Sequence, residues 1–138
     1  MRIIVRLFFC AKEEVPVNRK EIISYCLTYK NTYQNTPFRD KSQLVISHKG
    51  NRKVFAWFFE EAEGTYVRFR CKKESLSCYE AISGYLRRGF QFEDVYWIEI
   101  PIKHCPDISE DILKGIIEES YQISKPGKRR KSIRWYFT

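Results

Sequence analysis

Imidazole groups, which often bind metals or move protons near neutral pH, occur at only two positions in the chain. His48 lies in an alternating apolar segment, and His104 precedes Cys105. A zinc centre needs three or four ligands, and a catalytic thiol needs a base and an orienting group. The sequence offers no such set, no phosphate-binding glycine loop and no metalloprotease motif. We therefore predict a protein that is not an enzyme and that has no metal and no cofactor.

Aromatic and basic side chains are the other residues that could do chemistry. The segment 65–71 alternates so that one set of side chains faces the core and the other faces outward. Aromatic rings stack on bases, and guanidinium groups contact phosphates. The outward set, with a tryptophan from a later strand, predicts a nucleic-acid-binding face made of Tyr66, Arg68, Arg70 and Trp97, with Phe55, Trp57 or Phe59 between them. The alternative is a face covered by the N-terminal segment, the tail or a partner.

The C-terminal segment carries most of the positive charge. The formal net charge is +8, and residues 125–138 hold six basic and no acidic side chains, which leaves +2 for residues 1–124. Such a segment is typical of phosphate contacts or of a solubilising end. Alternation over Ser132–Phe137 also permits an added strand. The predicted phosphate contacts in the tail are Lys128, Arg129, Arg130, Lys131 and Arg134.

Alternating hydrophobicity predicts the strands that must position these groups. Three strands, at Gln43–His48, Lys53–Glu60 and Thr65–Cys71, form a meander. The middle strand is apolar on both sides, which is typical of a central strand. Gly50-Asn51 are expected to supply the positive φ of the first turn. A fourth strand at Tyr96–Ile102 should turn Trp97 and Glu99 outward.

Apolar side chains at helical spacing predict three helices. The first begins at Asn18 with a capping box and ends near Lys30, before the polar segment 31–36. The second spans Ser75–Arg88, with Arg87 and Arg88 in its last turn and Gly89 as its stop. The third spans Ser109–Ser124, and Ile116 should face the central strand. The predicted fold class is α+β, a two-layer arrangement with an antiparallel sheet and all helices on one face.

The 138 residues suit one domain at residues 18–124, between a leader or edge strand at 1–17 and a basic tail at 125–138. No apolar run reaches the roughly 18 residues of a membrane helix. The five cysteines show no pairing pattern, which favours reduced thiols in the cytoplasm. We expect a cytoplasmic monomer.

The segments NRKEIISYCLTY, TPF, GNRKVFAWF, YWIEIPI and DISEDILKGIIEESYQI, in this order over about residues 18–124, resemble the MmcQ/YjbR family. The resemblance implies a CyaY-like two-layer fold, in the order α-βββ-α-β(β)-α, and DNA binding through a double-wing arrangement. The chain departs from the family pattern at residues 89–96, where GFQFEDVY replaces a loop usually rich in histidine, asparagine and lysine. A frataxin-like iron role is disfavoured, because the first helix is basic rather than acidic.

These observations predict a non-enzymatic nucleic-acid-binding domain. The alternative is a protein-interaction module that uses the same aromatic and basic face to recruit a partner.

Overall fold

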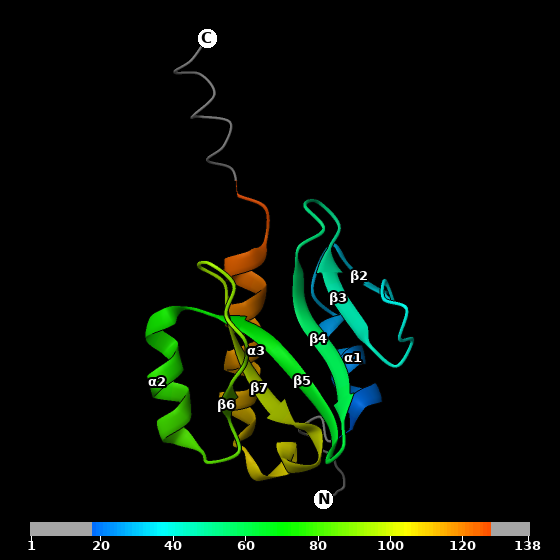
Figure 1. Ribbon diagram of the computed structural model, residues 1–138. Coiled ribbons are helices and arrows are strands. Elements are labelled where there is room, and N and C mark those ends of the chain that lie inside the picture. Colours follow the sequence, from blue (N-terminus) through cyan, green and yellow to red (C-terminus); the bar gives the residue numbers. More distant parts are fainter. Residues whose placement is uncertain (1–17, 128–138) are drawn as a thin grey trace, which may run out of the picture.

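Among the described residues, one layer of the protein is a six-stranded antiparallel sheet in the order β2-β3-β4-β5-β7-β6 (Figure 1). The computed structural model describes residues 18–127. The strands are β2 (Thr32–Asn35), β3 (Leu44–His48), β4 (Val54–Glu61), β5 (Gly64–Cys71), β6 (Arg87–Arg88) and β7 (Tyr96–Pro101). The helices are α1 (Arg19–Cys26), α2 (Lys73–Ile82), α3 (Glu110–Ser124) and the 3-10 helix η1 (Ile102–Asp107). The predicted α+β class and the four predicted strands are confirmed.

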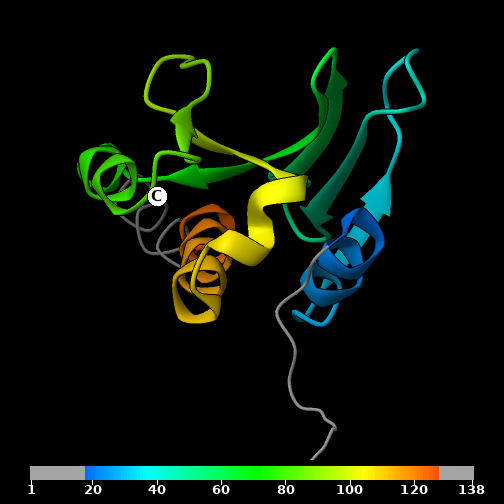
Figure 2. The ribbon, with the colours of Figure 1, turned by 90° about the horizontal axis from the view of Figure 1, so that it is seen from below.

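The helices form the second layer (Figure 2). Helices α1 and α3 lie on one face of the sheet, and α2 lies at its β6 end, beside α3. Glu119 of α3 joins these two helices, because its carboxylate accepts hydrogen bonds from Ser75, Tyr79 and the backbone N–H of Lys72. Within residues 18–127, no helix has the length and apolar character needed to cross a membrane. The core between the layers includes Ile22, Cys26, Ile46, Phe55, Ala56, Phe58, Val67, Phe69, Ile98, Ile100, Leu113, Ile116 and Ile117.

A β-bulge changes the orientation of one aromatic residue in the central strand β4. Ile46 pairs with Ala56 and Ser47 with Val54, so Phe55 has no partner on β3. The extra residue of a bulge reverses the alternation of side chains around it. Phe55 is consequently fully buried, in ring contact with Tyr29 and His48. The prediction that it shares the outer face with Trp57 is wrong for this reason.

Ser120 of α3 fills the gap that opens where β4 and β5 separate. Their pairing ends at Ala56 and Phe69. Beyond that pair, the Ser120 hydroxyl donates to the Phe55 carbonyl oxygen at 2.5 Å and accepts from the Arg70 N–H at 2.8 Å. Both backbone groups are thereby satisfied in a buried place, where an unpaired polar group is costly. This explains a fully buried serine on the helix face toward the sheet.

Two chain segments differ from the prediction. Helix α2 ends at Ile82 instead of Arg88, because Ser83 has extended backbone and its hydroxyl accepts from the Tyr85 N–H. Arg87 and Arg88 therefore form β6, paired with Glu99 and Ile98 of β7. Similarly, α1 ends at Cys26 instead of near Lys30, and the polar residues 32–35 form the edge strand β2, where no strand was predicted.

The turn between β3 and β4 also differs in detail. Its positive φ, 62°, belongs to Arg52 rather than to Gly50 or Asn51. Asn51 stabilises the turn in another way, because its side-chain oxygen accepts from the Lys53 N–H. Gly50 is required for a close approach, since a Cβ there would lie 2.8 Å from Pro126 Cγ.

Candidate functional site

The outer sheet face holds Arg68 inside a box of aromatic rings. Its guanidinium carbon lies 4.0 Å from the ring centroid of Phe59, 4.6 Å from that of Trp57 and 4.9 Å from that of Phe90. Its Nε donates to Glu99 Oε2 at 2.8 Å, and the side chain is only 15% exposed. The charge of Arg68 is therefore satisfied within the fold.

Glu99 links two arginines on this face. Its other oxygen accepts from Arg87 Nε at 2.7 Å, and the carboxylate is 6% exposed. Arg87 also pairs with Glu61 and lies 4.2 Å from the ring centroid of Tyr66. Gly89 allows the connection between β6 and β7 to pass close to Glu99, because a Cβ at Gly89 would lie 2.9 Å from Glu99 Oε2. Gly89 is thus a close-approach residue of the β6–β7 connection and not a helix stop.

The other two predicted residues of this face are also engaged. Arg70 Nε donates to the Val54 carbonyl oxygen at 2.6 Å, and its guanidinium lies 5.0 Å from the ring of Trp97. Trp97 is 4% exposed, and Tyr66 is buried and stacked on Phe59. The structure therefore brings Tyr66, Arg68, Arg70 and Trp97 together on one face, where they bind one another and neighbouring residues.

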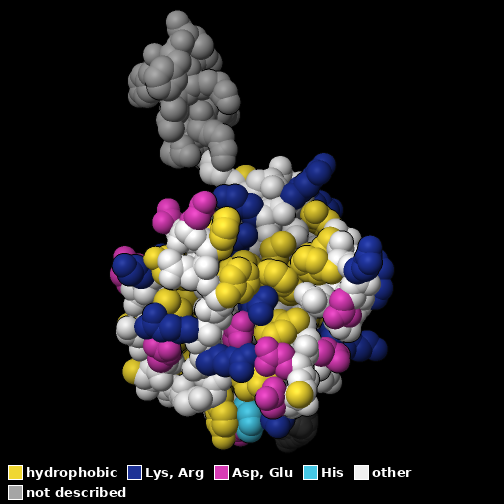
Figure 3. Space-filling model, viewed as in Figure 1, with side chains coloured by type: hydrophobic (Ala, Val, Ile, Leu, Met, Phe, Trp, Pro, Cys, Tyr) yellow, Lys and Arg dark blue, Asp and Glu magenta, His cyan; other side chains and the backbone are white. Residues whose placement is uncertain are grey.

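A row of three aromatic rings is accessible on the outer face, which Figure 3 shows with hydrophobic side chains gathered at its centre. Phe38 stacks on Trp57 with ring centroids 5.3 Å apart, and Phe90 meets Trp57 edge to face at 5.9 Å. Phe90 is 47% exposed, whereas Phe38 and Trp57 are half-buried. Hydrophobic side chains gather at the centre of this face, with basic and acidic groups among them. We call Phe38, Trp57 and Phe90 the ring row.

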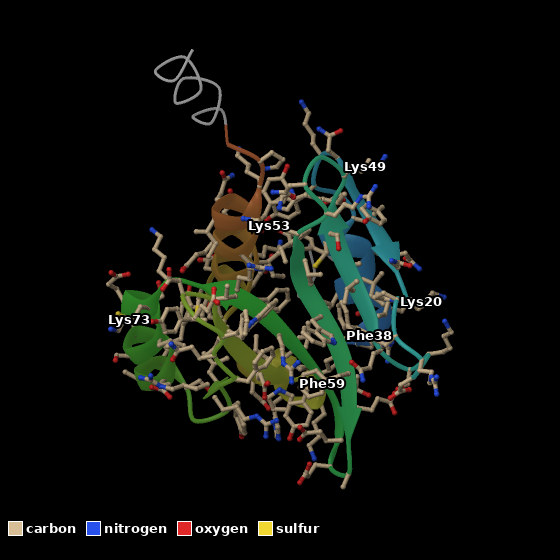
Figure 4. All side chains as sticks on the ribbon, turned by 45° about the horizontal axis from the view of Figure 1, so that its top comes forward. Lys20, Phe38, Lys49, Lys53, Phe59 and Lys73 are labelled. Carbon is tan, nitrogen blue, oxygen red and sulfur yellow. The ribbon has the colours of Figure 1, made fainter. Side chains whose placement is uncertain are left out.

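A second cluster is formed by basic side chains at the end of the molecule where α3 stops. The β3–β4 turn supplies Lys49, Arg52 and Lys53, the segment after α1 supplies Lys30, and Lys125 follows α3. All five are exposed, and none forms an ion pair within residues 18–127. Figure 4 shows Lys49 and Lys53 at this end, whereas Lys20 lies on α1 and Lys73 on α2. We call these five residues the cationic end.

The tail begins at the cationic end. The chain leaves α3 beside the β3–β4 turn (Figure 1), and Gly127 is the last described residue. The predicted phosphate contacts Lys128, Arg129, Arg130, Lys131 and Arg134 lie outside the described residues. Their position in the sequence nevertheless connects them directly to Lys125.

A pocket of about 550 Å³ opens among the basic residues. Its polar floor is well connected, because Tyr121 donates to the Lys30 carbonyl oxygen at 2.9 Å and Asn51 Nδ2 donates to that of Ser124 at 2.9 Å. The pocket is lined by Lys30, Asn31, His48, Lys49, Gly50, Tyr121, Lys125 and Pro126.

His48 is a neutral part of this floor. The Ser124 hydroxyl donates to the Ser120 carbonyl oxygen at 2.6 Å, so its oxygen is left to accept from His48 Nε2–H at 3.0 Å. Burial lowers the pKa of His48 from its ordinary value of 6.5, and the charges of Lys125 and Arg70 lower it further. Protonation therefore opposes folding.

We expect the lowered pKa of His48 to make the stability of the fold depend on pH. The unfolded chain binds more protons than the folded protein below about pH 6.5, so the free energy of unfolding should fall as the pH drops through that value. Urea unfolding between about pH 7.5 and pH 5.5 should show a steeper loss for the native sequence than for His48→Gln, which keeps a donor for Ser124. Equal slopes for His48→Gln and the native protein would contradict this assignment.

The described part of the chain contains no assembled site for metal binding or for a reactive thiol. No three His, Cys, Asp or Glu side chains there are grouped to hold a metal ion. His104 pairs with Asp107 at 3.0 Å, while burial raises the pKa of Cys105 to about 12. The Cys105 thiol is therefore protonated at neutral pH.

The sequence analysis did not predict the residues of the cationic end, which are Lys30, Lys49, Arg52, Lys53 and Lys125. They come from three separate segments, and only the run KGNRK at residues 49–53 signals a local concentration of charge. Phe38 and Phe90 of the ring row were missed as well, because both lie in connections rather than in alternating strands.

The fold is shared with two solved structures. A protein of Deinococcus radiodurans, DR2400, with a domain named DUF419, is 13% identical, with a TM-score of 0.65 over 80% of each chain. A protein of Pseudomonas syringae is 15% identical, with a TM-score of 0.63 over 78% of this chain and 99% of that one. At this identity the likeness concerns the fold alone.

A family model described as YjbR matches residues 27–123. The match spans the sheet, α2 and α3, and it agrees with the resemblance drawn from the sequence. No protein with a curated description matches the chain. The chain belongs to the YjbR family.

Proposed function

We propose that the protein binds nucleic acid through phosphate contacts made by the cationic end and the basic tail. The observation that carries this proposal is the convergence of five exposed basic side chains, free of ion pairs within residues 18–127, at the point where the tail begins. Phosphate contacts of this kind supply most of the affinity of non-specific nucleic-acid binding. No enzymatic step is part of the proposal.

The sheet face has a supporting role in this proposal. Arg68 and Arg87 already pair with Glu99, so a phosphate would have to compete with a buried carboxylate for them. The ring row is accessible and rests on this network, and exposed rings are platforms for unpaired bases. We assign Phe38, Trp57 and Phe90 to base stacking, and Tyr66, Arg68, Arg70 and Trp97 to the frame that holds them.

Fluorescence anisotropy with single- and double-stranded oligonucleotides at two salt concentrations tests the proposal. The variant Lys49→Gln/Arg52→Gln/Lys53→Gln should bind at least about tenfold more weakly at low salt. Its slope of log K against log salt should be smaller by up to about 3 for duplex DNA, because fewer counterions are released. All oligonucleotide sequences should be affected alike.

The matched control is Lys20→Gln/Lys73→Gln/Lys103→Gln, which removes the same charge from exposed positions elsewhere. It should bind nearly as the native protein does. Equal losses in both triple variants would mean that only net charge matters, and the cationic end would lose its assignment. If the native protein binds no oligonucleotide at low salt, the proposed function is wrong.

A protein partner on the ring row is the second candidate. Phe90 is 47% exposed and Phe92 62% exposed on the β6–β7 connection, where large apolar side chains face solvent. An apolar protein interface should persist at a salt concentration that abolishes phosphate binding. Phe90→Ser/Phe92→Ser should weaken such an interface and leave the salt slope for oligonucleotides unchanged.

A further inference from the structure

The pocket at the cationic end differs from an ordinary basic surface because it is hollow. Three lysines, Lys30, Lys49 and Lys125, line it, and no carboxylate of residues 18–127 belongs to its lining. A volume of about 550 Å³ lies within the range of about 300–1,000 Å³ that small-molecule sites occupy. The pocket is therefore large enough for a phosphate group together with part of the molecule that carries it.

The charged groups that line the pocket are the ammonium groups of lysines. Two carbonyl oxygens of its lining are already engaged, since that of Lys30 accepts from Tyr121 and that of Asn31 accepts from the Lys49 N–H. Next to the lining, the Ser124 carbonyl oxygen accepts from Asn51. His48 donates to Ser124. The ammonium groups of Lys30, Lys49 and Lys125 form no ion pair within residues 18–127, and ammonium groups bind oxyanions as point charges.

One feature of the fold opposes an anion here. Helix α3 ends at Ser124, and a helix C-terminus carries a partial charge of about −0.5. The combined positive charge of the three lysine ammonium groups exceeds this partial negative charge several-fold. Asn51 also donates to one of the terminal carbonyl oxygens. The balance favours a ligand with more than one negative charge.

A phosphate monoester has that charge. It carries about −1.5 to −2 near pH 7, whereas a phosphodiester within a nucleic-acid strand carries −1. A monoester also projects from the end of a molecule, so it can enter a pocket that a continuous strand would only cross. We propose that this pocket binds a terminal phosphate monoester, carried by a strand end or by a free nucleotide.

The strand-end form of this inference rests on the proposed function. Its test is a comparison of two 3′-labelled single-stranded oligonucleotides of one sequence, one with a 5′-phosphate and one with a 5′-hydroxyl group. The native protein should bind the phosphorylated strand at least about tenfold more tightly, which is the value of one hydrogen bond to a charged group. Lys30→Gln/Lys49→Gln should remove this preference, and the control Lys20→Gln/Lys103→Gln should keep it.

A substitution that changes only the shape of the pocket distinguishes binding in the pocket from a general effect of positive charge. Gly50→Ala introduces a Cβ 2.8 Å from Pro126 Cγ, which must displace this wall of the pocket without changing any charge. It should reduce the preference for the 5′-phosphate and leave binding of the 5′-hydroxyl strand unchanged. Its melting temperature, measured alongside, shows whether the fold is intact. If Gly50→Ala unfolds, the comparison of Lys30→Gln/Lys49→Gln with its charge-matched control Lys20→Gln/Lys103→Gln tests the pocket instead.

Thermal-shift titrations with inorganic phosphate and adenosine monophosphate identify the source of the phosphate. If either compound stabilises the native protein but not Lys30→Gln/Lys49→Gln, the pocket binds a free anion. If in addition no oligonucleotide binds, the proposed function is wrong and the pocket inference still holds. Equal binding of both strands, with no stabilisation by either compound, overturns the pocket inference. General phosphate binding by the cationic end would survive that result.

Discussion

Replacing Glu99 by alanine should lower the free energy of unfolding by about 3–5 kcal/mol, because it strands a buried charge. Glu99 is 6% exposed and holds Arg68 at 2.8 Å and Arg87 at 2.7 Å. Without it, Arg68 remains enclosed by Phe59, Trp57 and Phe90 with no anionic partner among residues 18–127. Arg87 is more exposed and keeps Glu61, so most of the loss should arise from Arg68. Urea unfolding monitored by tryptophan fluorescence measures the change.

Two further variants show whether stranded charge is the cause. Glu80→Ala removes the carboxylate of an exposed pair with Arg88 and should leave the urea midpoint unchanged. The double variant Arg68→Met/Glu99→Leu replaces the buried pair with apolar groups of similar size and should recover much of the stability lost in Glu99→Ala. A double variant that is as unstable as Glu99→Ala would contradict the explanation and point to lost packing.

Ile116→Ala should lower the free energy of unfolding by about 2–5 kcal/mol, the range for buried aliphatic side chains cut to alanine. Ile116 is fully buried in the core between α3 and the sheet. The cost combines the lost transfer of the side chain from water with the cavity that remains.

Ile123→Ala is the control on the same helix. This side chain is 40% exposed, so the same substitution removes fewer contacts and should cost less than about 1 kcal/mol. Comparable losses at both positions would mean that helix propensity or fraying, rather than the core, dominates. A native-like melting temperature for Ile116→Ala would contradict the placement of α3.

Local patterns in the sequence were sufficient for the main elements. The strands around Val54–Phe59 and Tyr66–Phe69 and the helix over Glu110–Ser124 were all predicted from alternation and helical spacing. These patterns work because an amphipathic element must bury its apolar side, whatever its neighbours are. The capping bond from the Glu21 N–H to Asn18 was predicted in the same way, since it depends on four consecutive residues.

Arg87 and Arg88 show where local reasoning failed. In the sequence they suit the last turn of a helix, where cations favour the dipole. In the structure they form an edge strand, because β7 offers backbone pairing and Glu99 and Glu80 offer carboxylates. These partners are distant in sequence or on another element, so no local pattern contains them.

The candidate site depended even more on the tertiary structure. The sequence determined which face of β5 carries Tyr66, Arg68 and Arg70, because alternation fixes sides. Only the register of β5 against β7 decided that Arg68 lies opposite Glu99 and is neutralised there. Likewise, Lys30, Lys49 and Lys125 are far apart in the chain, and they meet because α1, the β3–β4 turn and α3 end on the same side of the fold. Charge counted along a sequence does not reveal which charges are paired, since pairing is a property of distances that only packing sets.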